Sequence, residues 1–378
     1  MLGTRESLRK SRRVVVKVGT NILFENDGLS RNRMKVLARQ AAALKKEGRE
    51  VVIVSSGAIG SGFKKLGLTE RPTSLKMKQA CAAVGQVYLM AAWEKALDEV
   101  GLLSAQVLLS ADDLADRHRF LNAKNTLLTL LSYQVIPVIN ENDTVALEEL
   151  KVGDNDTLAG LIAGLVEADL FVNLSDIDGM YEEDPRKNPE ARLISEVDKV
   201  TPAILALAGD GGPFGTGGMY TKVRAAKRLS EQGTGSVIAS GGQRDVLLKI
   251  IDGQPIGTFF KPLVKKRMPG KKNWLAFASR PKGRLTVDAG CVLALTGKGK
   301  SLLPGGIVGL SGSFAVGDTV SIIDERGQVL GLGLCNYTST EVEKIMGKTS
   351  RQIMTILGYT HSDEVVHRDN LVLSEGLL

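Results

Sequence analysis

The first apolar run of the chain reads Arg13-Val14-Val15-Val16-Lys17-Val18, and it ends in a polar turn, Gly19-Thr20-Asn21. Its β-branched valines favour a strand, and the turn is typical of a strand that leads into a helix. Strands expected at 49–54, 135–139, 170–174 and 236–239 also end in polar or glycine-rich turns, with helical stretches between them. This alternation predicts an α/β fold: an αβα sandwich with a mostly parallel central sheet.

The ends of these strands predict one ligand site, because open α/β sheets bind ligands at the carboxyl ends of their strands. Lys17 is informative, because a lysine buried in an apolar strand loses its hydration. This loss is costly unless an anion pairs with the ammonium group. A second lysine closes a glycine-rich run before a helical stretch, Gly215-Thr216-Gly217-Gly218-Met219-Tyr220-Thr221-Lys222. Glycine loops and helix N-termini bring backbone N–H groups close to anions. The pattern favours a phosphate site, although a flexible surface loop has the same composition and the run is not a Walker A motif.

Two carboxylates, Asp154 and Asp156, lie at the start of a helix expected from Leu158 to Val166. Helix capping accounts for one of them. The second is not needed for capping, which marks it as a candidate site residue.

Composition limits the class of protein. The 378 residues are 43% hydrophobic and 24% charged, which fits an ordinary globular protein with two domains. The apolar run after the basic N-terminus is too short for a signal peptide or a membrane anchor. Three separated cysteines favour a reducing cytoplasm and no structural metal. The cysteines are Cys81, Cys291 and Cys335, and the histidines are His118, His361 and His367. Their spacing does not form a metal-ligand pattern.

A basic segment predicts the domain boundary. Residues 261–284 hold nine Lys or Arg and no acidic residue, so the net charge of +7 is concentrated there. Its three prolines favour a linker or a local surface that faces a polyanion. We expect a first domain at 1–260, a basic linker at 261–282 and a second domain at 283–378. Short β-rich runs around a tight hairpin, Asp324-Glu325-Arg326-Gly327, predict a small β-barrel there.

Six sequence blocks resemble the amino acid kinase family, and within it the members that phosphorylate L-glutamate. The blocks are Val15-Val16-Lys17-Val18-Gly19-Thr20, Ser55-Ser56-Gly57-Ala58-Ile59, Ile139-Asn140-Glu141-Asn142-Asp143, Lys151-Val152-Gly153-Asp154-Asn155-Asp156, Ser175-Asp176 with Gly179-Met180-Tyr181 and Asp184-Pro185, and Gly215 to Lys222. The resemblance implies ATP-dependent phosphorylation of the side-chain carboxylate of L-glutamate to L-glutamyl 5-phosphate, the first step of proline biosynthesis.

The resemblance also implies site roles. Lys17 and Lys222 would contact the transferring phosphoryl group, and Asp156 would orient both lysines. ATP would bind to Lys17, Ser175, Asp176, Thr216, Gly217, Gly218, Met219, Tyr220, Thr221 and Lys222. Glutamate would bind to Ser56, Gly57, Asp143 and Asn155. Asn21 stands where the family more often has serine, so no phosphate contact is expected from its side chain.

The reaction suits these residue types. A carboxylate acceptor is already ionised at pH 7, so no general base is needed. The site must neutralise phosphoryl charge, which lysines, Mg²⁺ and backbone N–H groups can do. Mg²⁺ would be carried mainly by the ATP phosphates, and no protein metal ligand is expected. Asp143 can pair with a substrate ammonium, which argues against an N-acetylated substrate.

The second domain resembles the PUA domain through Leu303-Pro304-Gly305-Gly306-Ile307 and Gly317-Asp318. PUA domains elsewhere bind RNA, so RNA contact is one interpretation, and a structural appendage with a solvated basic linker is the favoured one. An alternative for the whole chain is an RNA-associated protein whose kinase-like domain senses nucleotide. Lys17, Asp156 and Lys222 together favour catalysis. The resemblance further implies proline as an inhibitor, a dimer or tetramer, and a reductase that receives the product.

Overall fold

The computed structural model describes residues 3–25, 28–145, 155–209, 218–264 and 270–373. The chain divides into two compact units, Met1–Arg267 and Met268–Leu378. No helix within the described ranges has the length and apolar character that a membrane span requires.

The larger unit is built on an eight-stranded sheet with the order β5-β6-β4-β1-β7-β9-β10-β8. All neighbouring strands are parallel except β9 and β10, which are antiparallel. The strands are β1 (Arg13–Val18), β4 (Glu50–Val54), β5 (Ser104–Leu109), β6 (Ile136–Glu141), β7 (Leu170–Ser175), β8 (Glu196–Val197), β9 (Gly235–Ser240) and β10 (Thr258–Phe260). A separate two-stranded sheet consists of β2 (Phe24–Glu25) and β3 (Gly28–Leu29).

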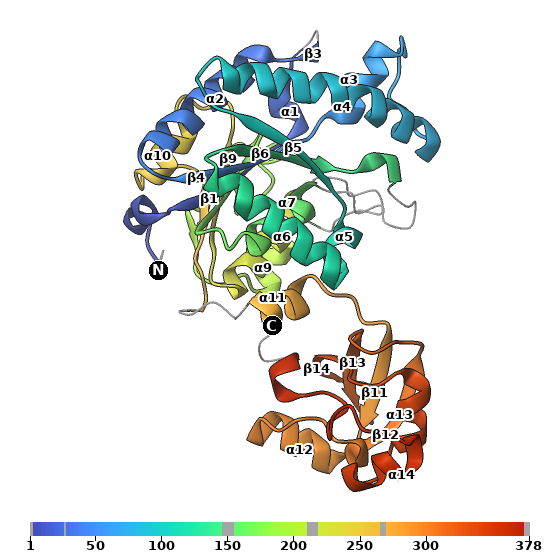
Figure 1. Cartoon of the computed structure of the whole chain (residues 1–378). Coiled ribbons are helices and arrows are strands. Elements are labelled where there is room, and N and C mark those ends of the chain that lie inside the picture. The colour runs from blue at the N-terminus through green and yellow to red at the C-terminus, as the bar shows by residue number, and fades with distance from the viewer. Residues whose placement is uncertain (1–2, 26–27, 146–154, 210–217, 265–269, 374–378) are drawn as a thin grey trace. The chain divides into compact units, whose positions relative to one another are not determined.

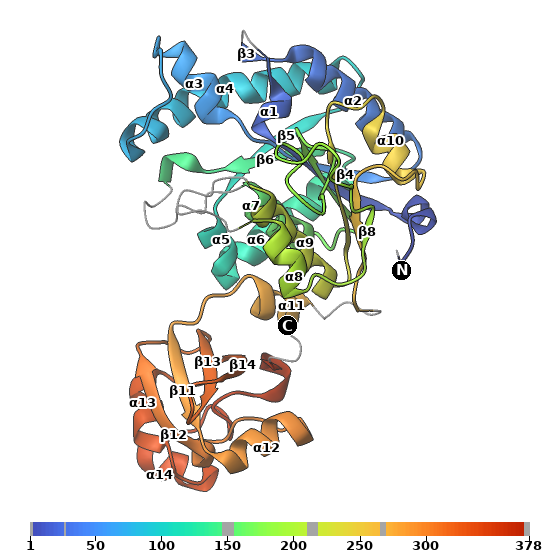
Figure 2. The same cartoon turned by 180° about the vertical axis from the view of Figure 1, so that it is seen from behind.

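Helices cover both faces of this sheet, as the two opposite views show (Figure 1, Figure 2). One layer contains α2 (Arg31–Lys46), α3 (Ala58–Lys65), α4 (Leu75–Asp98) and α10 (Val246–Ile251). The other contains α5 (Ala111–Ala115), α6 (Arg117–Ser132), α7 (Asn155–Leu165) and α9 (Met219–Glu231). Shorter elements are η1 (Glu6–Lys10), α1 (Thr20–Leu23), η2 (Asp143–Val145) and α8 (Pro202–Leu207). The αβα sandwich predicted from the sequence is therefore confirmed.

Central strands of the sheet are buried on both faces, as expected for a parallel sheet between two helical layers. In β1 every residue after Arg13 is buried. All five predicted strands are present, but β6 continues to Glu141, so Asn140 and Glu141 belong to the strand rather than to the turn after it. The strands β5, β8 and β10 were not predicted. β8 and β10 have only two and three residues, which is too short for a hydrophobic periodicity to be recognised.

The helix expected from Leu158 starts earlier. α7 begins at Asn155 and ends at Leu165, so Asp156 lies inside its first turn. The expected first residue, Leu158, was therefore three residues too late, and the expected last residue, Val166, one too late. Hydrophobic periodicity starts later than the backbone helix, because the first three residues of α7, Asn155 to Thr157, are polar.

The smaller unit carries a five-stranded sheet with the order β12-β11-β13-β14-β15. Its strands are β11 (Gly283–Val287), β12 (Ile307–Gly312), β13 (Thr319–Asp324), β14 (Val329–Leu334) and β15 (Leu371–Leu373). Its helices are α11 (Gly270–Phe277), α12 (Ala289–Lys298), α13 (Ser339–Ile345) and α14 (Ile353–Leu357), with short 3₁₀ turns η4 (Pro304–Gly306), η5 (Ser350–Gln352) and η6 (Arg368–Asn370). The predicted hairpin joins β13 to β14: Asp324 Oδ1 accepts from the backbone N–H groups of Arg326 and Gln328, at 2.9 and 2.8 Å.

The basic segment is not a uniform solvated stretch. It contains a helix, α11, and several of its cations have partners. Lys261 Nζ lies 2.8 Å from carboxylate oxygens of both Glu196 and Asp198, and Lys282 Nζ lies 2.7 Å from Asp318. Part of the concentrated positive charge is therefore neutralised locally.

Candidate active site

A fully buried carboxylate, that of Asp156, lies at the centre of the site. Lys17 Nζ is 2.5 Å from its Oδ1, and Lys222 Nζ is 2.9 Å from its Oδ2. Both lysines are almost completely buried, at 5% and 4% exposure. The structure thus brings together three residues that are spread over about two hundred positions of the sequence, and we call Lys17, Asp156 and Lys222 the ion triad.

Two neutral groups also contact this carboxylate. Asn173 Nδ2 lies 3.0 Å from Oδ1, and Thr221 Oγ1 lies 3.0 Å from Oδ2. Sequence reasoning missed Asn173 as a site residue. Its signal was a polar residue inside the otherwise apolar strand expected at 170–174.

The fold explains how these groups meet. Lys17 in β1 and Asn173 in β7 are register partners on neighbouring parallel strands. Asp156 lies in the first turn of α7, and Thr221 and Lys222 lie near the start of α9, whose N-cap is Gly218. Because α7 and α9 pack against each other, both helix starts reach the same edge of the sheet.

The electrostatics follow from this geometry. Burial alone would raise the pKa of Asp156, but the ammonium groups of Lys17 and Lys222 and their hydrogen bonds outweigh it and hold the pKa at about 2. The carboxylate is therefore ionised at any physiological pH. Two ammonium groups converge on one carboxylate, so the three charges do not balance. The triad by itself carries one net positive charge, and Asp176 lies close enough for the charge of Lys222 to help lower its pKa. Two ammonium groups at one edge of the sheet are suited to contact an anion such as a phosphoryl group.

Next to the triad, Asp176 follows the end of β7. Ser175 Oγ donates to its Oδ1 at 3.0 Å, and Asn21 Nδ2 donates to its Oδ2 at 2.8 Å. Burial would raise the pKa of Asp176, yet these two hydrogen bonds hold it below its ordinary value. Asn21, which was assigned no phosphate contact, orients an acidic side chain in this structure.

The residues expected to bind glutamate lie at the ends of neighbouring elements. Ser56 is buried after β4, and Gly57 is the N-cap of α3 with a φ of 105°, which favours glycine. Asp143 begins η2, and Asn155 begins α7. Among the described residues, the buried Oδ1 of Asn155 has no hydrogen-bond partner. An unpaired buried acceptor of this kind is a place where a ligand can donate.

Two carboxyl groups beside this region have raised pKa values. Burial, together with the charges of Asp143, Asp113 and Asp112, raises the pKa of Glu141 to about 8. Burial raises the pKa of Asp143 to about 6. Glu141 was not selected from the sequence, although it lies inside the quoted block Ile139-Asn140-Glu141-Asn142-Asp143.

Other predicted ATP residues are placed differently. Gly218 caps α9, whereas Met219 packs against a core cluster and Tyr220 stacks with the Arg224 guanidinium, 5.7 Å from the ring centre. Thr216 and Gly217 lie outside the described residues, as do the block residues 151–154. Within the described part of the chain, no group of three or more His, Cys, Asp or Glu is arranged to hold a metal ion.

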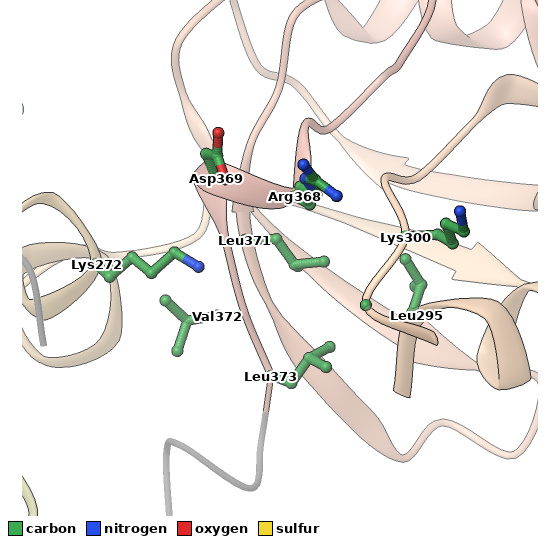
Figure 3. A pocket seen from close by; sticks show the side chains of 9 residues that line it. Lys272, Leu295, Lys300, Arg368, Asp369, Leu371, Val372 and Leu373 are labelled. Carbon is green, nitrogen blue, oxygen red and sulfur yellow. The ribbon is translucent and has the colours of Figure 1, made fainter. Parts of the chain in front are cut away.

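A second candidate site is a hollow of about 350 Å³ in the smaller unit (Figure 3). Its floor is apolar, and Lys272, Lys300 and Arg368 lie around it. It is lined by Lys272, Leu295, Gly299, Lys300, Arg368, Asp369, Leu371, Val372 and Leu373. None of the three cations forms an ion pair within the described residues, whereas Asp369 lies 3.6 Å from His367.

A parallel α/β sheet with a buried lysine–aspartate–lysine triad at its carboxyl edge defines a phosphoryl-transfer enzyme. Residues 12–240 match the amino acid kinase family, and residues 283–357 match the PUA domain. The chain therefore belongs to the amino acid kinase family, in the group of the glutamate 5-kinases, as its relatives show.

These relatives align over almost the whole chain. It is 48% identical to the glutamate 5-kinase of Syntrophotalea carbinolica over 98% of this chain and 100% of the relative. It is 50% identical to the glutamate 5-kinase of Thermus thermophilus over 97% of this chain and 98% of the relative. Among solved structures, the UMP kinase from Ureaplasma parvum is similar at 16% identity and a TM-score of 0.48, over 66% of this chain and 98% of that structure.

Proposed function

We propose that the chain transfers the γ-phosphoryl group of ATP to the side-chain carboxylate of L-glutamate and forms L-glutamyl 5-phosphate, the first step of proline biosynthesis. The ion triad carries this proposal, because buried ammonium groups held by one carboxylate are preorganised to meet phosphoryl charge. The family relationship supports the choice of acceptor. The free cysteines are compatible with a reducing cytoplasm.

In this mechanism, an oxygen of the glutamate side chain attacks the γ-phosphorus, and the bond from that phosphorus to the ADP oxygen breaks. The attacking carboxylate is already ionised, so no side chain needs to remove a proton. Lys17 and Lys222 would neutralise charge on the transferring group, and Asp156 would hold both ammonium groups in place. Mg²⁺ would be carried by the ATP phosphates and would lower their charge.

The substrates would occupy separate parts of the sheet edge. Ser175, Asp176 and the start of α9 would bind ATP, with backbone N–H groups at the helix start facing the phosphates. Glutamate would bind to Ser56, Gly57, Asp143 and Asn155, where the ionised Asp143 accepts from the ammonium and Asn155 offers its free acceptor. Proline carries the same α-carboxylate and a charged amine, so we propose that it competes with glutamate here.

The test is ADP release that depends on ATP and Mg²⁺, with L-glutamate, L-aspartate, N-acetylglutamate and UMP as parallel acceptors. Hydroxylamine would trap an acyl phosphate as a hydroxamate. A hydroxamate formed only with glutamate would support the proposal, and turnover with another acceptor alone would refute glutamate as the substrate.

Competition by proline is tested in the same assay. Adding proline should raise the KM for glutamate; an unchanged KM for glutamate would contradict competition. Since acyl phosphates hydrolyse, we also propose transfer of the product to a reductase.

We propose RNA contact as a second function of the smaller unit. The hollow in Figure 3 supports it, because its apolar floor and three cations, which form no ion pair within the described residues, suit a phosphate backbone with an unstacked base, although Asp369 also lines it. Filter binding of single-stranded RNA across a salt series would test it. Lys300→Ala should reduce the slope of log affinity against log salt by about 0.7 if it contacts one phosphate, with Lys344→Ala on α13 as the control. Absence of salt-dependent affinity would end the proposal.

A further inference from the structure

A pair of amides links the helix α4 to the end of the sheet. Asn140 Nδ2, at the carboxyl end of β6, donates to Gln86 Oε1 on α4 at 2.7 Å. Asn140 is buried, at 1% exposure, and Gln86 is half-buried. Neither residue takes part in the ion triad.

Each amide has an unused polar atom. Gln86 Nε2 and Asn140 Oδ1 are buried and have no partner among the described residues. One is a donor and the other an acceptor. Exchanging N and O in both amides would move the free donor to Asn140 and the free acceptor to Gln86, so the pair offers one donor and one acceptor in either orientation. In the orientation that the structure has, the free donor belongs to Gln86. Buried groups of this kind are rare without a ligand or water, because each one lost its hydration on folding.

The surroundings of the pair are the elements that carry the expected glutamate residues. α4 packs against η2, which begins with Asp143, and against α3, which begins after Gly57. Gly85, the neighbour of Gln86, lies so close to α3 that a Cβ there would be 1.8 Å from the carbonyl oxygen of Ala58. On the other side, Ser55 N–H donates to the carbonyl of Ile139, next to Asn140, at 2.8 Å. The amide pair therefore lies between the start of α3, the end of β6 and η2.

An α-amino acid presents a matching pair of groups on a single carbon. Its carboxylate only accepts hydrogen bonds, and its ammonium only donates them. We propose that Gln86 determines substrate specificity: Nε2 donates to the α-carboxylate of the amino acid, while Asn140 Oδ1 remains available to the ammonium. This inference rests on the proposed function, since it deepens the description of the same acceptor site.

The experiment compares L-glutamate with its α-carboxamide analogue, L-isoglutamine, which keeps the side-chain carboxylate that is phosphorylated. Gln86→Glu preserves the hydrogen bond from Asn140 but replaces the free donor with an acceptor that repels an α-carboxylate and can accept from an α-carboxamide. Gln86→Met removes the donor without adding charge. Lys78→Gln, at an exposed position on the same helix, changes the net charge by the same amount as Gln86→Glu and serves as the control.

For Gln86→Glu we expect kcat/KM with glutamate to fall about 10- to 100-fold, with the KM for ATP unchanged. With isoglutamine as the acceptor, kcat/KM of Gln86→Glu should rise relative to that of the unaltered enzyme. If isoglutamine is not phosphorylated, its Ki as an inhibitor against glutamate should fall instead. Gln86→Met should lose activity with glutamate without this gain. Equal losses with both compounds would mean that Gln86 only supports the fold, and an unchanged KM for glutamate would also overturn the inference. Failure of the unaltered enzyme to phosphorylate glutamate would instead refute the proposed function.

Discussion

Lys17 and Asn173 face each other across β1 and β7, and both contact the same oxygen, Oδ1 of Asp156. The other oxygen, Oδ2, contacts Thr221 and Lys222 on α9. One carboxylate thus connects the sheet with the helix that follows the glycine-rich run. This arrangement fixes the distance between the two lysines, which is what two charges acting on one phosphoryl group require.

Replacing Lys222 with alanine tests its proposed part in catalysis. Loss of one preorganised cation should lower kcat by about 10²- to 10³-fold, or about 3–4 kcal/mol. The fold should persist, because Lys17 still neutralises Asp156. Steady-state kinetics and thermal unfolding measure the two effects, with Lys46→Ala at an exposed end of α2 as the control. Near-normal turnover of Lys222→Ala would refute the role.

Asp156→Asn keeps the shape of the side chain but leaves two buried ammonium groups without a carboxylate. Breaking a buried ion pair from one side costs about 3–5 kcal/mol of unfolding free energy. The pKa of Asp156 is lowered in the folded state, so its contribution is present above the unfolded value near 3.8 and is lost as pH falls through about 2. Denaturant unfolding should therefore show the full difference at pH 7 and a shrinking one below pH 4. A difference that does not vary with pH would contradict this account.

Asp143 predicts a pH dependence for substrate binding. Burial raises its pKa to about 6, and only the ionised form can pair with a substrate ammonium. The KM for glutamate should be constant above pH 7 and should rise by up to tenfold for each pH unit below 6, while the KM for ATP responds less. Asp143→Asn should remove this dependence. A KM profile for glutamate with no inflection near pH 6 would show that this carboxylate does not bind the ammonium.

From the burial of Glu141 we expect that its replacement by glutamine stabilises the fold. Its folded pKa of about 8 exceeds the unfolded value of 4.5, so burial of the ionised form lowers stability as pH rises from 4.5 through 8. Glu141→Gln removes this charge and should raise the free energy of unfolding by about 2–5 kcal/mol at pH 9, with little effect at pH 4.5. Thermal unfolding at both values measures the difference. Destabilisation of Glu141→Gln at pH 9 would contradict this account, because it would mean that the ionised Glu141 carboxylate stabilises the fold.

The sequence predicted the architecture because the apolar strands are long and separated by regular helical stretches. Local pattern also marked Lys17 as a candidate, because a lysine in an apolar strand is an anomaly, and one of the two carboxylates before Leu158, because capping needs only one. That Asp156 would orient both lysines was implied by the family resemblance and not by the pattern. Asn173, Gln86 and the connection from Asn21 to Asp176 were missed. Their contacts span 17, 54 and 155 positions, and they join strands and helices whose pairing the local pattern does not encode.

The close packing of α3 on α4 predicts a strong effect of a single methyl group. A Cβ on Gly85 would lie 1.8 Å from the Ala58 carbonyl oxygen and 2.4 Å from Gly62 N, and backbone atoms cannot move aside as a side chain would. Gly85→Ala should therefore lower the free energy of unfolding by about 1–3 kcal/mol or more, and raise the KM for glutamate by displacing the start of α3. Gly297→Ala in α12 is the matched control: a Cβ there meets nothing within 4 Å, so it should stabilise by about 1 kcal/mol. If thermal unfolding shows a loss of stability for Gly85→Ala and a gain for Gly297→Ala, the contact between α3 and α4, and not helix propensity, requires glycine at position 85. A gain of stability for both variants would contradict this account.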